Sequence, residues 1–137
     1  MKKKLKKFNL TPENCVVIGS GILQALGIRK SKDIDVVVKQ GTYDALKETN
    51  QFTVKKNHGR EILDDGLFEI GTEWVVLGKS YRYDDLLKVS EVVDSVRYNN
   101  LDFLFRVKKS WVSGKTSRPK DVRDIELMEE YFKQRQE

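Results

Sequence analysis

The chain has a single cysteine, Cys15, and a single histidine, His58, among its 137 residues. One cysteine excludes an internal disulfide and is typical of a protein in a reducing compartment. No apolar stretch approaches the roughly 20 residues of a membrane-spanning helix, and the lysine-rich residues 2–7 lack the apolar region of a secretory signal. We therefore expect a cytoplasmic protein with no membrane partner, with Cys15 in the core and His58 in a turn between two strands.

The composition indicates one folded unit. Hydrophobic residues make up 39% of the chain and charged residues 34%, which is typical of a globular protein, and the length suffices for a proper core. There is no internal repeat and no Pro/Ser-rich linker. We expect a single domain over residues 1–137, in which residues 1–8 form a basic tail or a short helix.

Positive charge is in excess. The 26 basic residues outnumber the 21 acidic ones and give a net charge of +5, which favours an anionic partner such as a nucleotide, RNA or DNA. Much of the excess lies in residues 2–7, which suit a solubilising tail equally well.

Apolar patterns along the chain predict alternating strands and helices, and hence an α/β protein. The expected strands cover residues 15–18, 34–38, 52–56, 61–63, 67–70 and 74–77, with one more short strand near 92–96. The expected helices cover residues 21–26, 43–48 and 101–111, and after a break at Gly114 a last helix begins near Pro119, a residue that suits a first helical position.

The first candidate site is a glycine-rich turn. An apolar run at residues 16–18 ends at Gly19-Ser20-Gly21, and a helical segment follows. A helix that begins there directs its free backbone N–H groups and the positive end of its dipole into the turn. Glycine lets the backbone approach a bound group closely, and the Ser20 hydroxyl can donate one more hydrogen bond. The turn predicts a phosphate site, although Gly-Ser after a strand is also a common structural turn.

The second candidate site is the acidic pair Asp33 and Asp35. Alternate side chains of a strand point to the same face, so the two carboxylates project together. Such a pair suits Mg²⁺, which prefers oxygen ligands and completes its shell with substrate phosphates. A dinucleotide-binding fingerprint fits less well, because Gln24 stands where its third glycine belongs and the acidic pair comes too early.

Taken together, Gly19, Ser20, Asp33 and Asp35 resemble the signature of the minimal nucleotidyltransferases of the DNA polymerase β superfamily. That signature has Gly-Ser at the end of a first strand, a short helix, and Asp-x-Asp on the second strand. The resemblance spans roughly residues 16–128. It implies the nucleotidyltransferase fold, a mixed central β-sheet flanked by helices.

A second block, Arg118-Pro119-Lys120-Asp121 followed by Asp124, resembles a C-terminal pattern of the branch that holds small antibiotic and abortive-infection toxin-type nucleotidyltransferases. The resemblance implies that Arg118 and Lys120 bind the triphosphate, and that Arg29 and Lys32, in the loop before the second strand, do so too. The alternative is that Arg118 and Lys120 form ion pairs with Asp121 and Asp124, two acids that suit a structural role at a helix start.

The family also requires a third carboxylate on a later strand. Glu69 lies between two apolar residues and would face the opposite way from them, as a metal ligand or general base requires. Glu73 is the second candidate, but it follows Gly71, where the strand is expected to end or bulge. We prefer Glu69, although many relatives have Asp at this position.

The resemblance implies a Mg²⁺-dependent nucleotidyltransferase, with Mn²⁺ as an alternative ion. A nucleoside monophosphate would pass from a nucleoside triphosphate to a hydroxyl of a small molecule, a protein or RNA, and pyrophosphate would leave. Larger relatives bind acceptors with an additional helical domain, so either a second copy of the chain or a partner subunit supplies that surface, or the acceptor is bound shallowly. Two other classes stay open: a nucleotide-binding regulator with a degenerate site, and a basic nucleic-acid-binding module.

Overall fold

The computed structural model describes residues 1–57, 59–113 and 118–135. The strands of this part are β1 (Cys15–Ile18), β2 (Ile34–Val38), β3 (Thr53–Asn57), β4 (Arg60–Asp64), β5 (Phe68–Gly71), β6 (Glu73–Val76), β7 (Lys79–Arg82), β8 (Ser90–Val93) and β9 (Val96–Asn99). The helices are α1 (Lys2–Lys6), α2 (Gly21–Ala25), α3 (Gln40–Glu48), α4 (Tyr83–Leu87), α5 (Leu101–Val112) and α6 (Pro119–Arg135).

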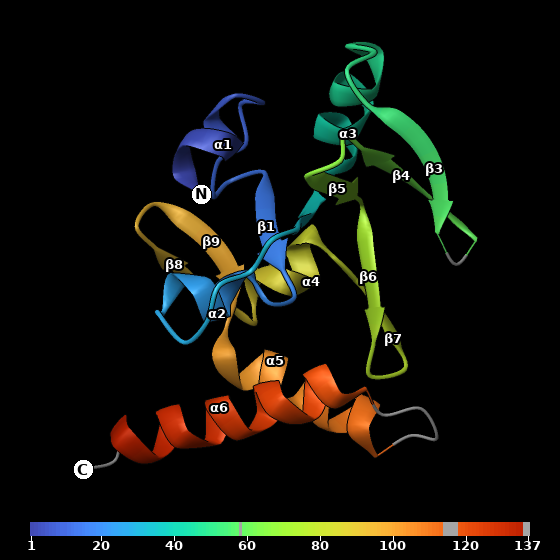
Figure 1. Ribbon diagram of the computed structural model, residues 1–137. Coiled ribbons are helices and arrows are strands. Elements are labelled where there is room, and N and C mark those ends of the chain that lie inside the picture. Colours follow the sequence, from blue (N-terminus) through green and yellow to red (C-terminus); the bar gives the residue numbers. More distant parts are fainter. Residues whose placement is uncertain (58, 114–117, 136–137) are drawn as a thin grey trace.

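The protein is a mixed α/β structure (Figure 1). In the described part of the chain, seven strands form one sheet in the order β3-β4-β5-β2-β1-β9-β8, and β6 and β7 form a separate hairpin. The sheet is mixed, because β1 runs antiparallel to β2 and parallel to β9, and β2 runs parallel to β5. The predicted mixed sheet is therefore confirmed at this level of detail.

The central strands are buried on both faces, which explains their nearly continuous valine and isoleucine content. Val17 and Val36 point into one core with α2 and α6, whereas Val16 and Val37 point into a second core with α4. Helix α5 contributes to both cores. One face of the sheet thus packs against α2 and α6 and the other against α4. Because alternate side chains of a strand point to opposite faces, a residue's position in the strand decides which of these helices it contacts.

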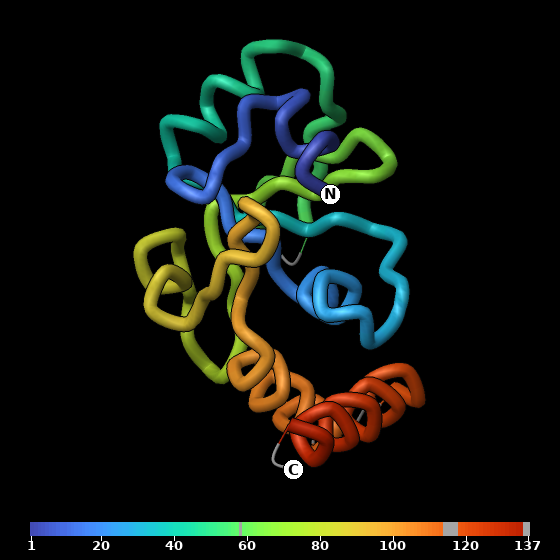
Figure 2. Tube along the Cα trace, turned by 90° about the vertical axis from the view of Figure 1, so that its left-hand side faces the viewer, coloured from blue at the N-terminus to red at the C-terminus, as the bar shows by residue number. Residues whose placement is uncertain are grey.

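Helices α5 and α6 pack against each other beyond the end of the sheet (Figure 2). The Asn100 side chain caps α5 by accepting a hydrogen bond from the Phe103 backbone N–H at 2.8 Å. Phe105 of α5 meets Phe132 of α6 edge-on, with ring centroids 5.6 Å apart. Within the described residues, no helix is both long and apolar enough to cross a membrane.

Two parts of the sequence prediction are wrong. The strand expected near residues 92–96 is a hairpin, because Asp94 and Ser95 adopt φ values of 50° and 67° and reverse the chain between β8 and β9. Strand β7 and helix α4 were not expected, because segments of four and five residues are too short to give a clear periodic signal. Residues 2–6 form the short helix α1 rather than a tail. The predictions at His58 and Gly114 lie outside the described residues.

Candidate functional site

The Gly19–Gly21 turn joins β1 directly to α2. Gly19 has φ +73°, in the left-handed region that favours glycine. A Cβ at Gly21 would lie 2.6 Å from Val17 Cγ1, so only glycine lets α2 start this close to β1. Sequence analysis located this turn correctly, and both glycines are required by its geometry.

Asp35 and Glu69 lie side by side on neighbouring strands. They are in register across the parallel pair β2–β5, and the apolar neighbours of each point into the core on the opposite face. Asp35 is also in register with Ile18, the last residue of β1, and a Cβ at Gly19 would lie 4.0 Å from Asp35 Oδ2. The carboxylate pair therefore adjoins the glycine-rich turn, as the sequence predicts.

The two carboxylates influence each other strongly. Burial, followed by the negative charge of Glu69 and a hydrogen bond that protonated Asp35 donates to it, raises the pKa of Asp35 to about 7. The charge of Asp33 adds to this rise, and the charge of Lys120 opposes it. A carboxyl with this pKa changes its charge near neutral pH, which is a property common at functional sites.

Asp33 and Lys120 occupy the rim of the site, since both are exposed and both act on Asp35. Asp33 and Lys32 are exposed in the loop before β2, and Lys120 is exposed in the first turn of α6. Because Asp33 and Lys120 both act on the pKa of Asp35, residues from β2, β5 and α6 form one electrostatic unit. The structure thus places Asp35 and Glu69 in register on neighbouring strands, with Asp33 and Lys120 near enough for their charges to act on Asp35.

The two arginines have carboxylate partners. Arg29 donates from Nε and Nη2 to both carboxylate oxygens of Asp124, at 2.6 and 2.8 Å, and from Nη2 to Ser20 Oγ at 3.0 Å. Arg118 donates to Asp121 at 2.9 Å, although its side chain is 65% exposed. The ion pair expected in the alternative interpretation is therefore present at Arg118, while Lys120 shows no such pair within the described part of the chain.

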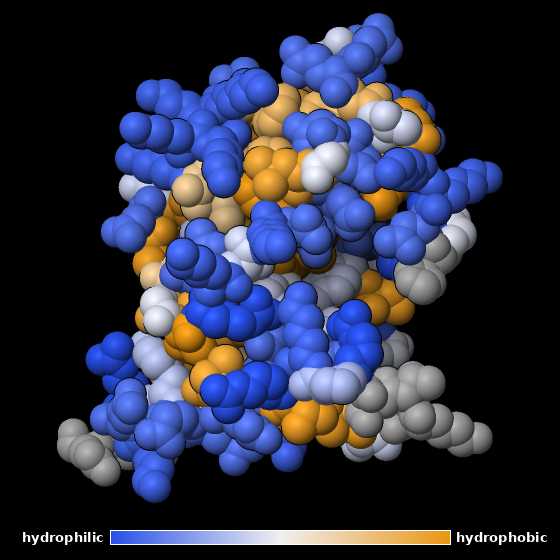
Figure 3. Space-filling model, in the orientation of Figure 1, coloured by the Kyte–Doolittle hydropathy of each residue, from blue (hydrophilic) through white to orange (hydrophobic). Residues whose placement is uncertain are grey.

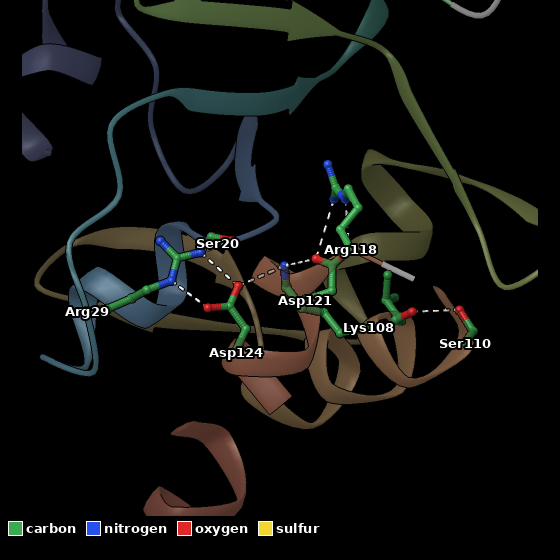
Figure 4. Close-up of polar contacts among 8 residues, drawn as sticks. Ser20, Arg29, Lys108, Ser110, Arg118, Asp121 and Asp124 are labelled. Atoms are coloured by element: carbon green, nitrogen blue, oxygen red, sulfur yellow. Dashed lines mark hydrogen bonds and ion pairs between the residues drawn. The ribbon is translucent and has the colours of Figure 1, made fainter. Parts of the chain in front are cut away.

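Beneath these arginines lies a buried lysine (Figure 4). Lys108 Nζ of α5 is 2.8 Å from Asp121 Oδ1 and 2.9 Å from Asp124 Oδ2, and the side chains of all three residues are at most 4% exposed. Burial by itself would raise the pKa of each aspartate, but the hydrogen bonds from Lys108 and from an arginine outweigh it and lower both pKa values. Asp121 and Asp124 thus bind Lys108 and link α6 to α5.

Sequence reasoning did not assign this role to Lys108. The signal was present, since Lys108 falls on the apolar face of α5 with Leu101 and Leu104. A lysine on such a face requires a buried anion, and α6 offers two carboxylates three residues apart, on one face of a helix.

Glu73 and Asp64 both lie near the pair but have other partners. Glu73 accepts a hydrogen bond from Ser80 Oγ and lies 3.7 Å from Arg60 Nε. Asp64 is the last residue of β4, in register with Glu69, and accepts hydrogen bonds from Lys55 Nζ and the Gly66 N–H, each at 2.7 Å. Of these acids, Glu69 is the one that stands beside Asp35.

A cleft of about 850 Å³ opens beside the carboxylate pair. Asp35 and Glu69 form part of its wall, together with Trp74, Trp111 and Arg118. On the face drawn in Figure 3, hydrophilic side chains cover most of the surface and apolar side chains show between them. The cleft is large enough for a small-molecule ligand and combines two flat indole rings with charged groups.

The donor set fits a hard divalent cation in part. Asp33, Asp35 and Glu69 offer oxygen only, which is the ligand type of Mg²⁺ and Mn²⁺. Burial, and after it the neighbouring carboxylates, raises the pKa of Asp35. Across residues 1–57, 59–113 and 118–135, no group of three or more His, Cys, Asp or Glu side chains lies close enough together to hold a metal ion.

No family model, no curated protein and no solved structure matches the chain.

Proposed function

We propose that this protein is a metal-dependent nucleotidyltransferase with the nucleotidyltransferase fold. It transfers a nucleoside monophosphate from a nucleoside triphosphate to an acceptor hydroxyl and releases pyrophosphate. The observation that carries the proposal is the pairing of Asp35 with Glu69 across β2 and β5, next to Gly19 and in the wall of the cleft.

The turn and the rim supply the groups that bind the triphosphate. Gly19 leaves the backbone open to a phosphate, and Ser20 donates its hydroxyl hydrogen to a phosphate oxygen. Lys120 and Arg118, both exposed at the start of α6, neutralise negative charge on the triphosphate as it grows during transfer.

The carboxylates supply the acid–base chemistry. Glu69 accepts the proton of the acceptor hydroxyl as the hydroxyl oxygen bonds to the α-phosphorus. The bond from the α-phosphorus to its bridging oxygen breaks, and pyrophosphate leaves with that electron pair. In the metal-free site Asp35 has a pKa of about 7, and a bound cation would favour its ionised form.

Asp35 and Glu69, which lie in register on neighbouring strands, would hold Mg²⁺ or Mn²⁺, with Asp33 at the rim of the site. When bound, such an ion offsets charge on the phosphates and on the attacking and leaving oxygens. Mg²⁺ is usually held by one or two protein carboxylates and completed by substrate phosphates and water. The lack of a three-residue group among the described residues is compatible with that mode of binding.

The test is calorimetric titration with ATP, GTP, CTP and UTP in turn, with and without Mg²⁺. We expect one triphosphate to bind in a Mg²⁺-dependent way and Asp35→Asn to lose that binding. Glu73→Gln is the matched control, because Glu73 lines the same cleft but is paired with Arg60; its binding should stay within twofold of wild type.

The other classes give different results. Triphosphate binding without pyrophosphate release in the presence of candidate acceptors would indicate a nucleotide-binding regulator. Salt-dependent binding of RNA or DNA that ignores both Mg²⁺ and Asp35→Asn would indicate a basic nucleic-acid-binding module. Either result would refute the transfer reaction.

A further inference from the structure

Arg29 is held at both ends of its guanidinium. Asp124 accepts hydrogen bonds from Nε and Nη2, at 2.6 and 2.8 Å, in a two-pronged ion pair. The remaining contacts run from Nη1 to the Lys30 carbonyl at 2.8 Å and from Nη2 to Ser20 Oγ at 3.0 Å. The N–H of Nε, one N–H of Nη1 and both of Nη2 are therefore committed. Figure 4 draws the contacts of Arg29 with Asp124 and Ser20.

This arrangement fixes the polarity of the Ser20 hydroxyl. Ser20 occupies the N-cap position of α2, yet its side chain makes no capping hydrogen bond within the described structure. Instead, its oxygen accepts a hydrogen bond from a cation. A hydroxyl has one hydrogen to donate, and with Arg29 directed at its oxygen, that hydrogen is left for another acceptor. A phosphate oxygen is an acceptor of the required kind.

Asp124 is the anchor of this chain of contacts. Its side chain is 1% exposed, against 21% for Arg29, and Lys108 Nζ holds its second oxygen at 2.9 Å. Asp124 lies on α6, 95 positions along the chain from Arg29. The C-terminal helix therefore reaches the glycine-rich turn through a single arginine.

We propose that Asp124 is a positioning residue for triphosphate binding: it holds Arg29 against Ser20, so that the Ser20 hydroxyl is presented as a donor to the triphosphate. The proposal rests on the proposed function. It also gives Arg29 a role different from that of Lys120, because Arg29 acts on the substrate through Ser20 and not by direct contact.

The experiment compares Asp124→Asn and Asp121→Asn, each in the wild-type chain and in a Ser20→Ala background. The two aspartates are a matched pair, because both lie buried on α6 and both are paired with Lys108, but only Asp124 contacts Arg29. The dissociation constant of the triphosphate that binds wild type most tightly is measured by calorimetry, with Mg²⁺ present.

We expect Asp124→Asn to weaken binding about tenfold, the effect of losing a hydrogen bond from a charged group. In the Ser20→Ala background the same substitution should change the dissociation constant less than twofold, because its effect runs through Ser20. Asp121→Asn should show the same change, whatever its size, in both backgrounds.

Three results would overturn the proposal. The first is an Asp124→Asn effect that persists in full after Ser20→Ala, which would mean a structural role. The second is an Asp124→Asn protein that binds like wild type. The third is no triphosphate binding by wild type, which refutes the proposed function as well and is thereby distinguished from the other two. If Asp124→Asn does not fold, Arg29→Lys carries the same expectation, because lysine lacks the two-pronged geometry.

Discussion

Lys108→Met should destabilise the protein substantially. Lys108 is the cation between Asp121 and Asp124, and its side chain is 4% exposed. Methionine fills similar space but leaves two buried carboxylates with one cation fewer. Removing one partner of a buried ion pair costs about 3–5 kcal/mol; because Arg118 and Arg29 still contact the two aspartates, we expect about 3 kcal/mol.

The cost should depend on pH. In the wild type both aspartates have lowered pKa values, so their ionised forms stabilise the fold above the unfolded-state pKa near 3.9, and this contribution is lost as pH falls through the folded pKa values. Without Lys108, burial is less well compensated and the two pKa values rise. The difference in unfolding free energy between wild type and variant should be largest near pH 7 and shrink below about pH 4.

Urea unfolding at pH 7 and pH 3.5 measures this difference. Lys109→Met is the control, since Lys109 is the next residue of the same helix and is exposed; we expect it within about 0.5 kcal/mol of wild type. If Lys108→Met is no less stable than Lys109→Met, or if it is destabilised equally at both pH values, Lys108 does not stabilise the fold by pairing with the two aspartates.

Three further predictions follow from the same geometry. Asp35→Asn should stabilise the metal-free protein by at least about 1 kcal/mol at pH 8. Because the pKa of Asp35 is raised, folding of the wild type becomes less favourable as pH rises from about 4 to 7. A gain in thermal melts that is equal at pH 4 and pH 8 would contradict this. Gly21→Ala should lower the free energy of unfolding by about 1–3 kcal/mol, because its Cβ would lie 2.6 Å from Val17 Cγ1. Gly41→Ala, where a Cβ meets nothing within 4 Å, should be neutral or slightly stabilising in the same melts. Cys15 is 3% exposed, and burial raises its pKa to about 12, so a thiol reagent should label it only after denaturant unfolds the chain; rapid labelling of the native protein would place Cys15 outside the core.

Much of the sheet could be predicted because its central strands are buried on both faces. Residues such as Val16 and Val36 form short apolar runs bounded by turn residues, and such runs indicate strands whatever lies around them. The hairpin at Asp94 and Ser95 could not be found this way. The chain reverses there because Asp94 and Ser95 both adopt positive φ, a conformation that is uncommon for residues other than glycine.

Alternation along the strand predicts the face on which Glu69 lies, and the family resemblance singled Glu69 out as a third carboxylate. Alternation placed each carboxylate on the face opposite its apolar neighbours, and β2 and β5 could bring them together only if they were adjacent and in register. That register comes from the packing of Ile34, Val36 and Ile70 into one core, a long-range outcome that no local pattern contains.

The partners of the buried ion pairs could not be predicted from the local sequence. From the sequence, Asp121 and Asp124 were helix-start acids and Arg29 was a loop cation, and each description is correct locally. Their partners are fixed by how α5 and α6 pack, which brings Lys108 between the two aspartates and Asp124 against Arg29. Because buried charges must be paired, the position of Lys108 on the apolar face of α5 indicates that it needs a buried anion as its partner. The same requirement ties the C-terminal helix to Ser20, which makes the proposed phosphate site sensitive to residues far from it in the sequence.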